Sequence, residues 1–212
     1  MIKSGKVNNM DNIQRAFEVS KSPSDFAKKY FKYLSVVLES ISPQSIDKLV
    51  KIFEESRKKG NTIFVIGNGG SSTTASTMAN DIGFDILKKT GISKAFKIHS
   101  LIDNSAVLTA IANDVGYENI FINQLKIHYK SGDKLIVITA SGNSENLIRA
   151  SKWVKSKKGK VVGFLGFDGG KMKSICDHII QINTKKNEYG IVEDCHLIIN
   201  HILAHWFQNK LK

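Results

Sequence analysis

A helix-like stretch near the C-terminus combines acids and histidines at spacings that could support proton transfer. Asp194 and His201 are seven positions apart, and His201 and His205 are four apart, so each pair would share one face of a helix. Glu193 precedes His201 by about two turns and could still converge on the same cleft. A carboxylate near an imidazole is suited to general acid–base chemistry. Because its neighbours are apolar, we expect His201 to have a functional role and His205 to be structural.

A glycine-rich run, residues 67–74 (GNGGSSTT), lies between an apolar stretch and a helical pattern. Glycines let the backbone turn sharply and approach a ligand, and the amides that open a helix can bind an anion. Ser72 stands where the third glycine of a dinucleotide-binding fingerprint would be, and no P-loop lysine follows. The run therefore predicts either an anion-binding loop of another kind or a tight turn between a strand and a helix.

Two further loops follow apolar runs. Residues 139–144 (TASGNS) place three hydroxyls and a glycine directly before a helix that starts at Glu145. Such a loop can surround a phosphate without a lysine, although an ordinary serine cap is the alternative. Residues 166–171 (GFDGGK) lack P-loop spacing, and we expect a plain turn there.

The elements that would position these loops alternate along the chain. Ser22-Pro23 and Ser42-Pro43 each place a capping hydroxyl before a proline, and Gly60 is a helix stop. Short apolar runs then alternate with stretches that are mostly long enough for helices, the pattern of a parallel sheet covered on both faces. These runs are residues 62–66, 95–99, 134–139, 161–165 and 178–182, and a final helix follows around Glu193–Gln208.

We therefore predict a single α/β domain over residues 1–212, with a helical arm at 1–60 and an α/β core at 61–212. Ligands of such a sheet bind beyond the carboxyl ends of its strands, where the three loops lie.

Composition sets the broad class. The chain has 212 residues, of which 42% are hydrophobic and 24% charged, as in an ordinary soluble globular protein. No apolar run reaches the ~18–20 residues of a membrane helix, and the N-terminus predicts no secretory signal. Cys176 and Cys195 are too few for a disulfide framework or a cysteine-built zinc site, so we expect a cytoplasmic location.

The net charge of +12 raises the question of nucleic-acid binding. Only Arg15, Arg57 and Arg149 supply the guanidinium groups that read phosphates and guanine in a bidentate manner. The lysines are spread along the whole chain, which is typical of a solvated surface. We expect no dedicated nucleic-acid or membrane binding, but an electrostatic attraction for phosphorylated anions.

Over residues 36–203 the sequence resembles the sugar isomerase (SIS) domain family, and within it the phosphoheptose isomerases. The similarity rests on residues 67–71 (GNGGS), 105–116 (SAVLTAIANDVG), 141–146 (SGNSEN) and 192–203 (VEDCHLIINHIL). The resemblance implies a flavodoxin-like, five-stranded parallel sheet and a helical arm used for assembly. It also implies a homotetramer whose sites lie between subunits.

The resemblance further implies a sugar-phosphate site on the loops after the strands. The serine loop would hold the phosphate, and the glycine loop together with an aspartate would surround the polyol. The implied substrate-binding residues are Asn68, Gly69, Gly70, Ser71, Asp103, Thr139, Ala140, Ser141, Gly142, Asn143 and Ser144.

Family isomerases use a glutamate after the glycine loop and a histidine on the last helix as the acid–base pair. Here these positions are Asp81 and His201, while Thr77 replaces a second histidine and Glu193 a glutamine. Gly190 stands where a polyol-binding aspartate is expected. The catalytic candidates are therefore Asp81, His201 and Glu193. Some family members bind zinc, but with one imidazole missing we predict no cofactor; Asp81, Glu193 and His201 are the set that could still hold the ion.

The expected function is ketose–aldose isomerisation of a phosphorylated sugar, with conversion of sedoheptulose 7-phosphate to a heptose 7-phosphate as the leading candidate. The alternatives are a non-catalytic regulator that binds phosphosugars and a tetramer that binds another protein. Thr77 and Asp81 favour these alternatives, because they depart from the family pattern, whereas the retained His201 favours catalysis.

Overall fold

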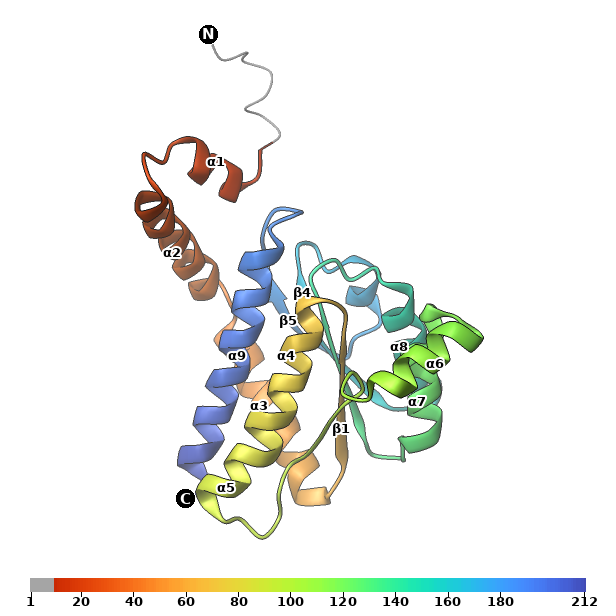
Figure 1. Cartoon of the computed structure of the whole chain (residues 1–212). Coiled ribbons are helices and arrows are strands. Elements are labelled where there is room, and N and C mark those ends of the chain that lie inside the picture. The colour runs from red at the N-terminus through yellow and green to blue at the C-terminus, as the bar shows by residue number, and fades with distance from the viewer. Residues whose placement is uncertain (1–9) are drawn as a thin grey trace.

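The computed structural model describes residues 10–212. Helices lie on both sides of a single β-sheet (Figure 1). The prediction of no secretory signal rests on the N-terminal residues, and most of these lie outside the described residues. Within them, no helix combines the length and apolar character that crossing a membrane requires.

Within residues 10–212, five parallel strands form a single sheet in the order β2-β1-β3-β4-β5. The strands are β1 (Thr62–Gly67), β2 (Lys97–Ser100), β3 (Lys134–Thr139), β4 (Lys160–Gly166) and β5 (His178–Ile182). The predicted α/β fold with a five-stranded parallel sheet is confirmed. After their first residues the central strands β1, β3 and β4 are mostly apolar and fully buried, because helices cover both of their faces.

Helices cover the two faces of the sheet. Along residues 10–212 the α-helices are α1 (Asn12–Glu18), α2 (Pro23–Glu39), α3 (Pro43–Lys59), α4 (Gly70–Met78), α5 (Ile86–Thr90), α6 (Ser105–Val115), α7 (Ile120–His128), α8 (Glu145–Ser156) and α9 (Tyr189–Lys210). Helices α3, α4 and α9 lie on one face and α7 and α8 on the other (Figure 1). Shorter helical segments are η2 (Ala79–Asp85), η3 (Tyr117–Asn119) and η4 (Gly170–Ser174).

The helix ends follow the predicted signals. The Ser22 and Ser42 side chains accept hydrogen bonds from the amides of Asp25 and Ser45, each with proline at the first helical position. Gly60 ends α3 in the left-handed conformation, with φ of +70°. Within the predicted arm, α3 packs on β1 and β5, whereas α1 and α2 extend past the sheet (Figure 1). The boundary at residue 60 stays a prediction.

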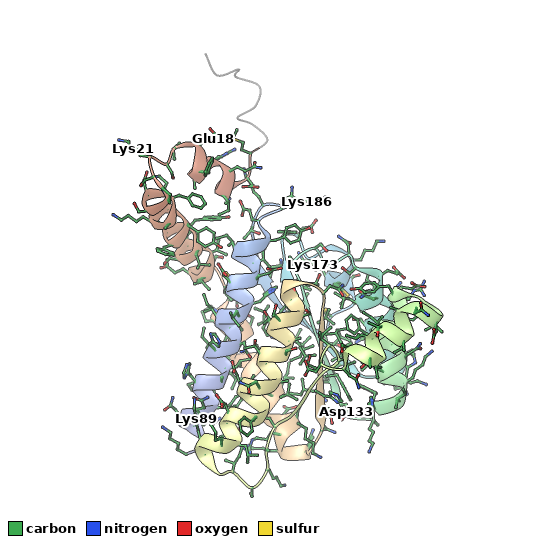
Figure 2. All side chains as sticks on the ribbon, in the orientation of Figure 1. Glu18, Lys21, Lys89, Asp133, Lys173 and Lys186 are labelled. Atoms are coloured by element: carbon green, nitrogen blue, oxygen red, sulfur yellow. The ribbon has the colours of Figure 1, made fainter. Side chains whose placement is uncertain are left out.

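The strand order creates a switch point between β1 and β3. The chain leaves β1 toward α4 on one face and leaves β3 toward α8 on the other. In open α/β sheets a crevice opens at such a point, beyond the carboxyl ends of the strands. In Figure 2, Lys173 and Lys186 mark the carboxyl ends of the strands. Asp133, which directly precedes β3, marks the opposite, amino ends of the strands. The glycine and serine loops therefore flank the same crevice.

Candidate functional site

The glycine loop is built for a close approach between β1 and α4. A Cβ at Gly67 would lie 2.7 Å from the Ser71 carbonyl oxygen, and Gly69 has a φ of +54°. The amides of Ser71 and Ser72 donate to the carbonyls of Asn68 and Gly69, and the Ser71 side chain is buried. Those two amides shape the loop itself. The loop thus presents its exposed glycines and the Asn68 side chain to the crevice.

Asn68 joins the two sides of the switch point. Its side-chain amide exchanges two hydrogen bonds with that of Asn146 on α8, of 3.0 and 2.9 Å. The Tyr117 hydroxyl also donates to Asn68 Oδ1, at 3.0 Å. These contacts hold the side chain of Asn68 in one orientation. Asn146 and Tyr117 were not among the predicted site residues, because only the strand order brings them to the glycine loop.

The serine loop leaves one hydroxyl free at the start of α8. Ser144 is the capping residue, yet its side chain makes no capping hydrogen bond within residues 10–212. Thr139 is buried, and its hydroxyl accepts from the Gly142 amide at 3.1 Å, which closes the turn. Ser141 Oγ accepts from the Asn143 amide at 3.4 Å. The Ser144 hydroxyl and the helix N-terminus are therefore available to an anion.

The third loop, predicted to be a plain turn, supports the serine loop. A Cβ at Gly142, whose φ is +65°, would lie 2.0 Å from the Gly169 carbonyl oxygen. The Lys171 amide donates to Asn143 Oδ1 at 3.1 Å, and the Met172 amide to the Gly142 carbonyl at 3.0 Å. These contacts bring the cationic segment η4 to the edge where a phosphate would bind, which favours anions electrostatically.

A pocket of about 270 Å³ lies beside the glycine loop and is bounded by α6 and Tyr117. Asp103 follows β2 and is exposed at the same edge, and its carboxylate accepts from the Ser76 hydroxyl of α4 at 2.5 Å. The predicted substrate-binding residues thus come from three loops that end neighbouring strands. The structure places them together at the carboxyl ends of the strands.

Glu193 also lies at the carboxyl ends of the strands, on the first turns of α9. A Cβ at Gly70 would lie 2.3 Å from Glu193 Oε2, so the carboxylate rests directly on the glycine loop. Burial raises the pKa of Glu193, and the neighbouring charge of Asp194 raises it further. The Tyr30 hydroxyl of α2 donates to Asp194 at 2.6 Å and so ties α2 to the start of α9.

Asp81 and His201 form a separate pair further along the same two helices. Asp81 Oδ2 lies 3.6 Å from His201 Nε2 and accepts a hydrogen bond of 2.8 Å from the Asn200 side chain. His201 is about half exposed, whereas Asp81 is largely covered. His196, another histidine of α9, is fully buried, and burial lowers its pKa to about 3. Of the predicted catalytic residues, the chain therefore brings Asp81 and His201 together.

Glu193 does not join this pair within one chain. It contacts Gly70, and Asp81 comes eleven residues later along the continuous α4–η2 helix, a distance of about 16 Å at 1.5 Å per residue. Spacing around α9 had suggested a single cleft for Glu193 and His201. Their partners on α4 and η2 instead lie at two different heights along the helix.

The separation of Glu193 from Asp81 and His201 also decides whether these three residues could bind zinc together. Within the described part of the chain, no group of three or more histidine, cysteine, aspartate or glutamate side chains could hold a metal ion. Asp81, Glu193 and His201 consequently do not fit a metal site in one chain.

Comparisons with known proteins place these features in context. The family model of the SIS domain matches residues 26–166. A phosphoheptose isomerase of Leptospira biflexa is 38% identical over 176 residues, covering 82% of this chain and 88% of the relative. One from Aliarcobacter butzleri is 33% identical over 179 residues, covering 84% and 91%. The structure of a phosphoheptose isomerase from Neisseria gonorrhoeae superposes with a TM-score of 0.78 at 23% identity, covering 89% of this chain and all of that one, and supports the fold.

Proposed function

The chain belongs to the SIS domain family, and from that premise we propose that it is an isomerase that interconverts the ketose and aldose forms of a phosphorylated sugar. The proposed substrate is sedoheptulose 7-phosphate, and the product is a heptose 7-phosphate. Relatives at 33% and 38% identity that carry the phosphoheptose isomerase name support this choice. The observation that carries the catalytic reading is the Asp81–His201 pair, a carboxylate within 3.6 Å of an imidazole nitrogen.

In the proposed mechanism, the Asp81 carboxylate removes the proton from the carbon beside the substrate carbonyl, which gives an enediol. His201 transfers a proton between the two oxygens, or assists ring opening. Return of the carbon-bound proton to the neighbouring carbon completes the isomerisation. No oxidant or reductant is consumed, because the ketose and the aldose are isomers.

The direct test is turnover. Purified protein incubated with sedoheptulose 7-phosphate should form an aldose that NMR can follow. A lack of turnover, combined with retained phosphosugar binding, would favour the alternative of a non-catalytic regulator. The named relatives favour the isomerase over that alternative and over a protein-binding tetramer. The cytoplasmic location stays a prediction.

We further propose that the chain assembles as a homotetramer with sites between subunits. Within one chain the serine loop lies at the carboxyl end of β3. Asp81 and His201 lie on η2 and α9, which cover one face of the sheet, further from that end of the strands. A second subunit could bring the two parts together. An apolar groove of about 910 Å³ along α9 supports the proposal, since it includes His201 together with Ile202 and Trp206, which are 47% and 53% exposed.

The sequence of the arm predicts that six apolar residues pack between subunits: Phe26, Tyr30, Tyr33, Leu34, Val37 and Leu38. Within one chain, most of these side chains already pack against the core. Val37 is buried in the chain's own core, and Tyr33, Leu34 and Leu38 pack against it. Phe31 and Val36 are the exposed apolar side chains of α2.

Light scattering tests the proposed tetramer. At micromolar concentration the measured molar mass should be four times 23.5 kDa, and the mass of a monomer would contradict the proposal.

The serine loop provides a prediction about binding. Replacing Ser144 or Ser141 with alanine should weaken phosphosugar binding by roughly 10-fold or more for each serine, since each hydroxyl would donate to a charged phosphate. Calorimetry measures the affinity. Ser156→Ala, at the other end of α8, is the matched control and should bind like the parent. Unchanged affinity in both loop variants would remove the serine loop from the site.

A further inference from the structure

Asn200 is buried in a way that packing alone does not explain. It is 0% exposed on α9, within the core beneath the α4–η2 helix. Its Nδ2 donates to Asp81 Oδ2 at 2.8 Å, while its Oδ1 has no hydrogen-bond partner within residues 10–212. A buried polar atom without a partner costs free energy, so an apolar side chain of similar size would suit the fold better. The retained amide therefore points to a need at Asp81.

The contacts of Asp81 show what the amide does. Asp81 Oδ1 accepts from the neighbouring Asn80 side chain at 3.1 Å, and Oδ2 receives the Asn200 hydrogen bond. The same Oδ2 lies 3.6 Å from His201 Nε2. Asn200 and His201 are consecutive on α9, one directed into the core and the other toward solvent. The carboxylate is thereby held at the line where the two helices meet, within reach of the imidazole.

The local backbone supports the same view. Asp81 lies in η2, a π-helical segment of residues Ala79–Asp85 that continues α4 and packs against α9. Turns of π-helix are rare and occur frequently at functional sites, because they redirect the side chains of an otherwise regular helix. Asn200 is the residue of the facing helix that holds the second carboxylate oxygen of Asp81 on this segment.

We propose that Asn200 is a positioning residue for the isomerase reaction, whose buried amide orients the Asp81 carboxylate for proton abstraction beside His201. This inference rests on the proposed function. It adds a residue that neither the sequence motifs nor the family pattern had singled out. It also accounts for how a shorter carboxylate can serve at this position.

The first test is Asn200→Leu. We expect kcat to fall at least ~10-fold with KM changed less than ~3-fold, since displacements near 1 Å can cost up to ~100-fold in rate. Thermal stability should be equal to the parent's or higher, because the unpartnered Oδ1 is removed. Asn61→Leu, the same change in the turn before β1, at the opposite end of the strands from the glycine and serine loops, is the matched control and should retain the parent's kcat. Asn200→Ser, which is too short to reach Asp81, should reproduce the loss if the leucine variant does not fold.

A double-mutant cycle distinguishes positioning from a purely structural role. In an Asp81→Asn background, Asn200→Leu should cause no further loss of kcat, because the group that it orients is already inactive. Losses that multiply, or a parent-like kcat for both single Asn200 variants, would overturn the inference while the isomerase assignment stands. A parent without turnover on sedoheptulose 7-phosphate would instead overturn the proposed function, and this inference with it.

Discussion

Replacing His201 with alanine is expected to reduce kcat by about 1000-fold while phosphosugar binding persists. Removal of a general acid–base group costs ~10²–10⁴-fold, and His201 is the imidazole that lies beside the carboxylate. The phosphate would be held by the serine loop, which is a separate segment at the end of β3. NMR measures turnover, and calorimetry measures binding of the phosphosugar.

His128→Ala is the matched control for this experiment. His128 is exposed at the end of α7, on the opposite face of the sheet from α9. We expect this variant to retain turnover within a factor of about three, as for a surface substitution that leaves the reacting groups in place. An active His201→Ala enzyme would remove the imidazole from the mechanism. A variant that loses both turnover and binding would indicate that His201 holds the ligand instead of transferring a proton.

The second large effect is expected at Asp81. Asp81→Asn keeps the size of the side chain and should lower kcat at least ~100-fold, the lower range for removal of a general base. Glu193→Gln should lower kcat less than ~10-fold, since Glu193 rests on Gly70 and does not contact the imidazole. Asp85→Asn provides the control, because Asp85 lies on the same π-helical segment and pairs with Lys88 and Lys89.

Glu193 is the competing base, and the comparison decides between the two carboxylates. Burial raises its pKa, and a raised pKa is a property of many carboxylate bases that work near neutral pH. A Glu193→Gln variant that loses activity, with Asp81→Asn nearly unaffected, would assign the base to Glu193. Parent-like rates in both variants would leave the reaction without a carboxylate base and would contradict the proposed mechanism.

Local sequence signals determined most of the secondary structure. The five apolar runs predicted the strands to within about two residues, because a parallel sheet that is covered on both faces needs continuous apolar residues. The serine–proline pairs and Gly60 marked helix ends correctly, since capping depends on side chains next to the helix end. The positions of the glycine and serine loops followed directly, since each comes at the carboxyl end of a strand.

The order of the strands, and therefore the neighbours of each loop, came only from the tertiary structure. The Asn68–Asn146 pair joins residues 78 positions apart, and the Asp81–Asn200 hydrogen bond joins residues 119 apart. No local pattern encodes such contacts, which depend on how whole elements pack. The third loop also gained its role in this way, by supporting the serine loop across β3 and β4.

The catalytic candidates show the same division. Spacing along α9 determined which of its residues share a face, because helical geometry is local. It left undetermined which residue of α4 or η2 lies opposite each of them, since this depends on how far the two helices are shifted along each other. That shift places Glu193 at Gly70 and His201 at Asp81, and packing of both helices against the sheet sets it.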